Sequence, residues 1–97
     1  MTGKQKKYLR TMAHSLKPIV NLGKHGLSTE TKNEIDAQIL EHELIKLKVL
    51  DSSPISHKEC ADFLRQENRL EVVQIIGKTL TLYSPHPEEP KIELPSV

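Results

Sequence analysis

The residues best suited to chemistry are two glycines and the two side chains between them, in the segment Gly23-Lys24-His25-Gly26. Glycine adopts backbone angles that other residues avoid, and it lets a bulky partner approach the main chain. The segment precedes a predicted helix, whose free amide N–H groups and positive dipole end suit an anion such as phosphate. Lys24 adds a full positive charge. The spacing alone is more typical of a strand-to-helix connection that binds nothing.

Charge is distributed unevenly along the chain, although the formal net charge is only +1. The first acidic residue is Glu30, and six lysine or arginine side chains precede it. Such a block is usually a solvated helix face. Next to a loop suited to phosphate, it is also what a polyanionic partner requires.

The composition excludes several other classes of function. A chain of 97 residues is long enough for one domain, and its single cysteine, Cys60, allows no internal disulfide and fits a reducing compartment such as the cytoplasm. No apolar run approaches the length of a membrane span. The five histidines lack the spacing of a metal site, and no nucleophile stands with an evident base. We therefore predict no catalytic site, metal or cofactor.

Residue patterns predict seven elements that position the glycine segment. A helix over residues 4–14 is followed by a strand over 19–22, a helix from Ser28 to about His42, and a strand over 43–50. A capping box, Ser56-His57-Lys58-Glu59, introduces a third helix, and Gly77-Lys78 joins two hairpin strands, 70–76 and 79–83. This order predicts a small α/β domain with a mixed four-stranded sheet.

The same patterns predict which side chains are buried and where the domain ends. The domain is expected over residues 1–84, followed by an extended tail over 85–97 that is rich in Pro and Glu and in which Ile92 and Leu94 are candidates for docking. The helical residues predicted to face the core are Tyr8, Leu9, Met12, Ala13, Leu16, Thr31, Ile35, Ala37, Ile39, Leu40, Cys60, Ala61, Phe63 and Leu64.

Three blocks in this order, residues 16–28, 42–48 and 73–83, closely resemble the YhbY-like CRM domain family. The resemblance covers residues 2–84. It implies an RNA-binding module that resembles the C-terminal domain of a translation initiation factor in fold. It also implies a bacterial stand-alone form associated with precursors of the large ribosomal subunit, whereas multi-domain plant relatives act in organellar intron splicing. The family's Gly-x-x-Gly loop falls on the segment Gly23 to Gly26. The C-terminal tail of this chain is acidic, whereas family members end in a basic segment.

We therefore expect a monomeric, non-enzymatic protein that binds large-subunit ribosomal RNA or a pre-ribosomal particle and no membrane. One alternative is an interaction module that binds a ribosomal protein or assembly factor through an apolar and cationic sheet face. Another is an RNA-modifying enzyme that uses His25. The predicted RNA contacts are Gly23, Lys24, His25, Gly26, Lys4, Lys6, Lys7, Arg10, Lys17, Lys46, Lys48 and Lys78.

Overall fold

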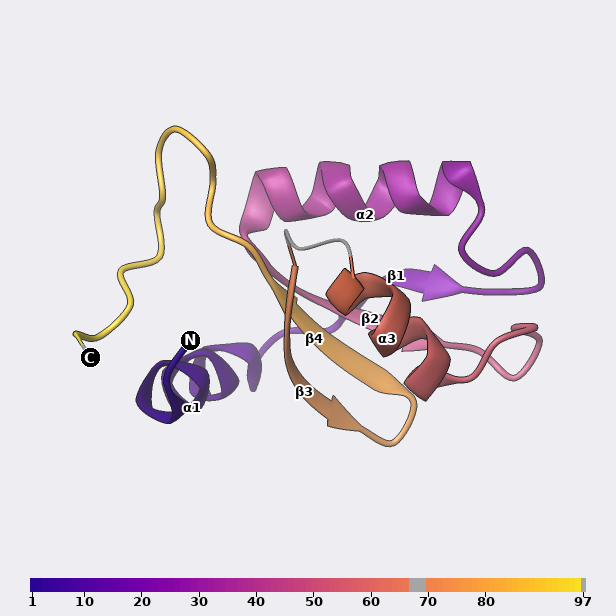
Figure 1. Cartoon of the computed structure of the whole chain (residues 1–97), viewed down its shortest axis with the longest axis horizontal. Coiled ribbons are helices and arrows are strands. Elements are labelled where there is room, and N and C mark those ends of the chain that lie inside the picture. Colours follow the sequence, from indigo (N-terminus) through magenta and orange to yellow (C-terminus); the bar gives the residue numbers. More distant parts are fainter. Residues whose placement is uncertain (67–69, 97) are drawn as a thin grey trace.

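The computed structural model of the chain describes residues 1–66 and 70–96 and confirms the predicted order of elements (Figure 1). The predicted helix and strand ends agree with the observed ones to within one residue. The elements are α1 (Gly3–Ala13), β1 (Pro18–Leu22), α2 (Thr29–His42), β2 (Leu44–Val49), α3 (His57–Gln66), β3 (Glu71–Ile76) and β4 (Thr79–Tyr83).

Each helix begins where a hydroxyl side chain can accept a hydrogen bond from its first turn. The Gln5 N–H donates to Thr2 Oγ1 at 3.2 Å, and the Thr2 N–H donates to Gln5 Oε1 at 3.0 Å. The predicted capping box before α3 is also present, because Ser56 and Glu59 exchange the same two bonds at 3.1 Å each. Local sequence therefore fixes these helix starts independently of the rest of the fold.

The four strands form one mixed sheet in the order β1-β2-β4-β3. β1 runs parallel to β2, which is why the chain needs α2 as a crossover between them. β4 pairs antiparallel with both β2 and β3. The pairing of β3 is irregular between Val72 and Gln74, where Val73 has no partner in the register with β4. Val72 and Val73 are buried on opposite faces, as the alternation of a strand requires.

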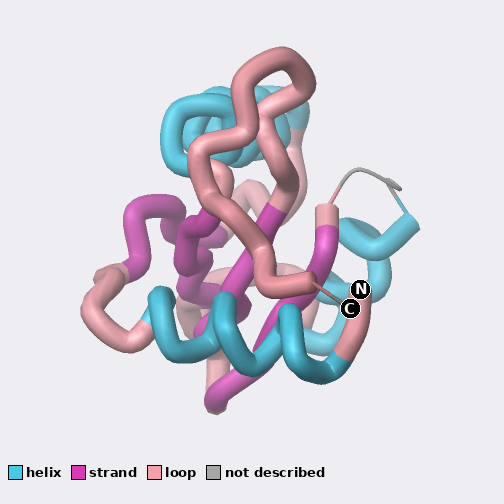
Figure 2. Tube along the Cα trace, turned by 90° about the vertical axis from the view of Figure 1, so that its left-hand side faces the viewer, coloured by secondary structure: helices cyan, strands magenta, loops and turns pink. Residues whose placement is uncertain are grey.

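The two faces of the sheet are covered differently. One face lies under α2 and α3 and forms the larger apolar cluster, which includes Leu22, Leu47 and Leu82. The other face is covered by α1 only at one end, where Leu9 and Ala13 pack on the sheet. Figure 2 shows α2 above the strands and α1 below them. Part of the second face is therefore left without a covering helix.

Several side chains predicted to face the core are exposed instead. Leu40 is 52% exposed and Phe63 is 51% exposed, and Ala37 is exposed as well. In α2 the sheet is covered by Ile35 and Ile39, which lie one turn apart on the same helix face. Ala37 and Leu40 lie outside that face, so they do not point at the sheet. The prediction was also wrong for Tyr8 and Met12, at the edge of the α1 stripe, and for Leu16, which lies beyond the end of α1.

The C-terminal segment is held against the domain by one buried carboxylate. Glu43, 2% exposed, accepts hydrogen bonds from the backbone N–H groups of His86 (2.7 Å), Lys91 (2.8 Å) and Ile92 (2.9 Å). Ile92 and Leu94 then pack against the cluster under α1, as predicted. The described part of the tail therefore reaches α1, where Gln5 Nε2 donates to the Pro95 carbonyl oxygen at 3.2 Å (Figure 1).

Burial raises the pKa of Glu43, but the three backbone hydrogen bonds outweigh burial, so the pKa lies below its ordinary value. Glu43 therefore stabilises the fold above the ordinary pKa of a glutamate, and this contribution is lost as the pH falls through the lowered pKa. We expect Glu43→Gln to lower the free energy of unfolding by about 2 kcal/mol at pH 7. The difference from wild type should shrink at acid pH.

Urea unfolding at a series of pH values measures this difference. Glu41→Gln is the matched control, because Glu41 is a nearby glutamate, in the last turn of α2, that is exposed. A Glu43→Gln protein as stable as wild type at pH 7, or a difference that does not change with pH, would contradict the assignment.

Candidate nucleic-acid interface

The glycine segment forms a turn between β1 and α2. The Gly26 N–H donates to the Gly23 carbonyl oxygen at 3.0 Å, which closes the turn. Lys24 and His25 stand at its tip and are both exposed. Two residues later Ser28 caps α2 by accepting a hydrogen bond from the Thr31 N–H at 3.2 Å. The turn therefore presents a lysine and a histidine to solvent beside the start of a helix.

The two glycines have different roles. Gly26 has a φ of +58°, and a Cβ atom there would lie 3.1 Å from Cγ of Pro54. Both the backbone angle and the available space therefore require glycine at this position. Gly23 has no positive φ, and its nearest neighbours would be 3.8 Å or more from an added Cβ. The expectation that both glycines adopt angles closed to other residues is wrong for Gly23.

The loop after β2 supports this turn. The Leu50 N–H donates to the Leu22 carbonyl oxygen at 2.9 Å, which extends the β1–β2 pairing up to the turn. Pro54, in the same loop, provides the contact that fixes Gly26. The turn, this loop and the β3–β4 connection all lie at the same end of the molecule in Figure 1.

Two of the predicted cationic contacts are paired with carboxylates. Lys78, in the β3–β4 connection, forms an ion pair with Asp51. The hydrogen bond from Lys78 and its positive charge lower the pKa of Asp51. Lys6 lies 3.8 Å from Glu71. These partners offset part of the positive charge that Lys78 and Lys6 would offer to an anion.

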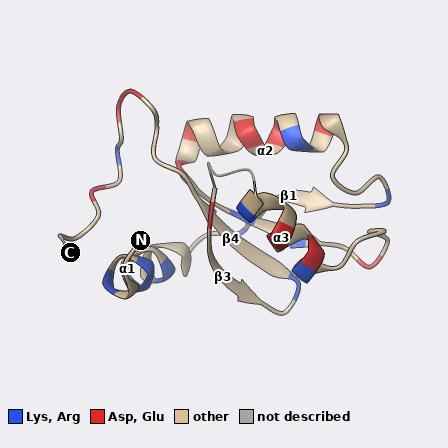
Figure 3. Cartoon of the chain, viewed as in Figure 1, with Lys and Arg blue, Asp and Glu red and all other residues tan. Residues whose placement is uncertain are grey.

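The structure does not bring the cations of α1 next to the glycine turn. Figure 3 shows the Lys and Arg positions of α1 at one end of the molecule and the turn at the other end. α1 precedes β1 whereas the turn follows it, so the length of the strand separates them. Closeness in sequence therefore did not predict closeness in space. Lys4 and Lys7 are exposed on α1, and Arg10 is half-buried.

An uncovered part of the sheet lies between these two ends. Leu47 and Val49 of β2 point into the larger cluster, so the alternating residues Lys46 and Lys48 point to the opposite face. A shallow hollow of about 240 Å³ lies on this face and is lined by Pro18, Lys46, Ile76, Thr79 and Thr81. We call the open sheet face the surface formed by Ile19, Asn21, Lys46, Lys48, Ile76 and Thr79. Thr81 lies on the same face but is buried, at 3% exposure.

The open sheet face contains residues that the sequence predictions did not select. Thr79 and Thr81 pair with Lys48 and Lys46 across the β2–β4 ladder and share their face. The alternation of threonine with leucine in β4 was the available signal. Lys17, exposed just before β1, extends the cationic surface toward α1.

The remaining candidates for chemistry are not in this region. Burial raises the pKa of the Cys60 thiol to about 11, which is typical of a core cysteine and not of a nucleophile. Within residues 1–66 and 70–96, no group of three or more His, Cys, Asp or Glu side chains is arranged to hold a metal ion. No helix in those residues is long and apolar enough to cross a membrane.

Comparisons with known proteins give a consistent result. A family model described as the CRS1 / YhbY (CRM) domain matches residues 1–84. The chain is 39% identical over 95 residues to the Bacillus subtilis protein named "Probable RNA-binding protein YqeI", covering 98% of this chain and 99% of that one. A Haemophilus influenzae protein named "RNA-binding protein" is also 39% identical over 95 residues, covering 98% of this chain and 95% of that one.

A solved structure shares the fold. The solution structure of a Staphylococcus aureus protein, described there as a candidate RNA-binding protein, superimposes with a TM-score of 0.75. Its sequence is 39% identical, and the match covers 98% of this chain and 99% of that one.

The two glycines should respond differently to substitution. Gly26→Ala should lower the free energy of unfolding by about 1 to 2 kcal/mol, because alanine disfavours the left-handed angle. Gly23→Ala should change it by no more than about 0.5 kcal/mol. Urea unfolding measures both values. Adding Pro54→Ala to Gly26→Ala should recover only the part of the lost unfolding free energy that is due to the close contact. Equal losses of stability at the two glycines would contradict this account.

Proposed function

Because this chain belongs to the CRS1 / YhbY (CRM) domain family, we propose that it is an RNA-binding protein that acts without a catalytic step. The observation that carries the proposal is the cationic open sheet face, which lies between the basic helix α1 and the exposed Lys24 turn. The names of the relatives support RNA as the ligand class. We further propose that the RNA belongs to the large ribosomal subunit or its precursor particle, in the cytoplasm.

We propose that the turn contacts the RNA backbone through its tip. Lys24 and His25 are both exposed there, and Gly23 leaves the main chain accessible without straining it. The start of α2 is a weaker phosphate site than its dipole suggests. Glu30 already places a negative charge in its first turn, and the Thr31 N–H already donates a hydrogen bond to Ser28 Oγ. The charge of Lys24 therefore carries the contact.

The open sheet face would continue this contact toward α1. Lys46, Lys48 and Lys17 are spread along it, and we propose that they bind phosphates together with Lys4, Lys7 and Arg10. Lys6 and Lys78 would contribute less, because each is already paired with a carboxylate. None of the residues that define the open sheet face is aromatic, so base stacking like that on RNP-type sheets is not available there. Recognition would therefore depend on backbone position and shape.

One observation favours the alternative, an interaction module that binds a ribosomal protein or assembly factor through the same face. Ile76 is 66% exposed and Ile19 is 44% exposed, at opposite edges of the open sheet face. Exposed isoleucines suit a protein partner better than they suit phosphates. The salt dependence of RNA binding and crosslinking in cells distinguish the two ligands.

Substituting Lys46 and Lys48 by Gln should weaken binding to RNA of any sequence, because phosphate contacts carry no sequence information. The slope of log affinity against log salt concentration should fall by about 0.7 to 0.9 for each phosphate that is no longer neutralised. Fluorescence anisotropy with a labelled large-subunit ribosomal RNA fragment, repeated over a salt series, measures both. Lys32→Gln with Lys58→Gln, on α2 and α3 over the other face of the sheet, removes the same number of charges and is the control. An unchanged slope in the folded double variant would overturn the role of these lysines.

Crosslinking in cells identifies the ligand. Wild type should enrich large-subunit ribosomal RNA, and Gly23→Asp should lose that enrichment, because it adds negative charge to the turn at a position where the backbone tolerates a side chain. Enrichment of other RNA would refute the ribosomal assignment. A partner protein recovered after nuclease treatment, with no RNA crosslinked, would favour the interaction module.

A further inference from the structure

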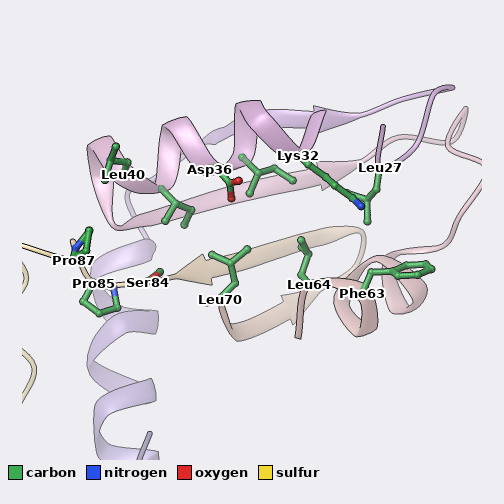
Figure 4. Close-up of a pocket in the computed structure, with 12 residues that line it drawn as sticks. Leu27, Lys32, Asp36, Leu40, Phe63, Leu64, Leu70, Ser84, Pro85 and Pro87 are labelled. Carbon is green, nitrogen blue, oxygen red and sulfur yellow. The ribbon is translucent and has the colours of Figure 1, made fainter. Parts of the chain in front are cut away.

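The C-terminal segment, residues 85–96, passes from one side of the sheet to the other. Figure 4 shows Pro85 and Pro87 on the Leu40 side of the hollow between α2 and α3, so the segment starts beside the end of α2. Figure 2 shows it running from there to α1, which lies on the opposite face of the sheet. The segment therefore connects the two helical layers. It lies beyond residues 1–84, which the family model matches.

Two kinds of contact anchor the segment before it reaches the first turn of α1. The buried carboxylate of Glu43 accepts the three backbone hydrogen bonds described above. Further along the segment, Ile92 and Leu94 pack against the apolar cluster that contains Leu9 and Ala13 of α1. Four residues of the segment are prolines, which restrict its backbone even when it is not held. Less conformational entropy is therefore lost when the segment is fixed in place.

The first half of α1 is only weakly attached to the sheet. The buried residues of this helix are Leu9 and Ala13, and both belong to its second half. Within residues 3–8, all of which the structure describes, no side chain is buried. This half nevertheless carries Lys4 and Lys7, two exposed cations of the proposed RNA surface.

Two polar contacts connect that first half to the rest of the domain. Lys6 lies 3.8 Å from Glu71, but both side chains are more than a third exposed, and exposed ion pairs contribute little to stability. The other contact is the hydrogen bond that Gln5 Nε2 donates to the Pro95 carbonyl oxygen at 3.2 Å. The second contact exists only while the C-terminal segment is anchored.

We propose that residues 85–96 form a clamp that holds the first half of α1 in place and so keeps Lys4 and Lys7 positioned for RNA binding. A helix that is already fixed loses less conformational freedom when it binds, so the clamp raises RNA affinity without adding a contact. Ile92 and Leu94 are positioning residues in this proposal, because they act on RNA through α1. The effect on RNA binding rests on the proposed function, whereas the clamp itself does not.

The clamp has a charge that opposes RNA binding. It contains Glu88, Glu89 and Glu93 against one lysine, Lys91. If the segment acted through charge alone, its release from the domain would remove negative charge from the neighbourhood of a basic helix and would tighten RNA binding. A clamp has the opposite effect, since its release weakens RNA binding although negative charge moves away.

Backbone order parameters from NMR relaxation, measured on the full chain without RNA, test the clamp. In Ile92→Ser/Leu94→Ser, the order parameters of residues 3–8 should fall below about 0.6, while those of β2 and β4 stay near the rigid value of about 0.85. Glu88→Gln/Glu89→Gln is the matched control, because it changes exposed side chains of the same segment and should leave α1 rigid. A rigid α1 in the serine variant would overturn the proposal.

A second variant tests the clamp without altering any apolar contact. Gln5→Glu retains the capping box, because a glutamate oxygen still accepts from the Thr2 N–H, but a carboxylate has no N–H to donate to Pro95. The order parameters of residues 3–8 should fall in this variant as well. If the serine variant does not fold and α1 stays rigid in Gln5→Glu, the proposal is wrong.

Fluorescence anisotropy with the same ribosomal RNA fragment tests the effect on binding. Ile92→Ser/Leu94→Ser leaves the net charge unchanged and should weaken binding by about threefold or more. The conservative variant Ile92→Val/Leu94→Met should bind like wild type, and Glu88→Gln/Glu89→Gln should bind no more weakly than wild type. Tighter binding by the serine variant, or wild-type affinity while its α1 is mobile, would overturn the positioning role.

Failure of the proposed function gives a different result from failure of the clamp. If the wild-type protein does not bind RNA, the proposed function is refuted, and the role of the clamp in binding is refuted with it. The order parameters, which are measured without RNA, still decide whether residues 85–96 hold α1.

Discussion

The arrangement of this domain depends on one buried carboxylate that accepts hydrogen bonds from backbone N–H groups. Glu43 ends α2 in a left-handed conformation (φ 65°), and its N–H donates to the Ile39 carbonyl oxygen at 2.7 Å. Its own carbonyl oxygen accepts from the Ser84 N–H at 3.0 Å, and its side chain gathers three N–H groups of the C-terminal segment. One residue thus joins the end of a crossover helix, the last strand and the segment that packs on α1. A buried charge is tolerated here because backbone dipoles solvate it.

Much of the fold follows from local sequence signals. Capping residues, alternation and turn glycines predicted every helix and strand in the right order, because these signals act within a few residues. The prediction of burial failed where it depends on how wide the buried face of a helix is. The spacing of Leu40 and Phe63 is compatible with burial, but only the crossing of α2 and α3 over the sheet decides that both stay exposed. The role of Glu43 was not predicted, since its hydrogen-bond partners are more than 40 residues away.

The candidate site was less accessible to sequence reasoning than the fold. The exposed turn at Lys24 was identified from its glycines, although only Gly26 requires glycine for its backbone angle. The cations before it in the chain lie at the far end of β1. The surface that connects the two regions comes from β2 and β4, which are distant in sequence and adjacent only through the sheet. Pairing of Lys78 with Asp51 is likewise a property of the tertiary structure.

The alternation in β2 has a consequence for which changes of length the chain can accept. Leu47 and Lys48 are neighbours in sequence, but their side chains point to opposite faces of the sheet. A single inserted or deleted residue within the strand would turn its lysines into the apolar cluster and its leucine and valine into water. Core and surface would be disrupted together. The same change in an exposed loop would only lengthen or shorten a connection. The number of residues in β2 is therefore constrained both by the apolar cluster on one face and by the charged surface on the other.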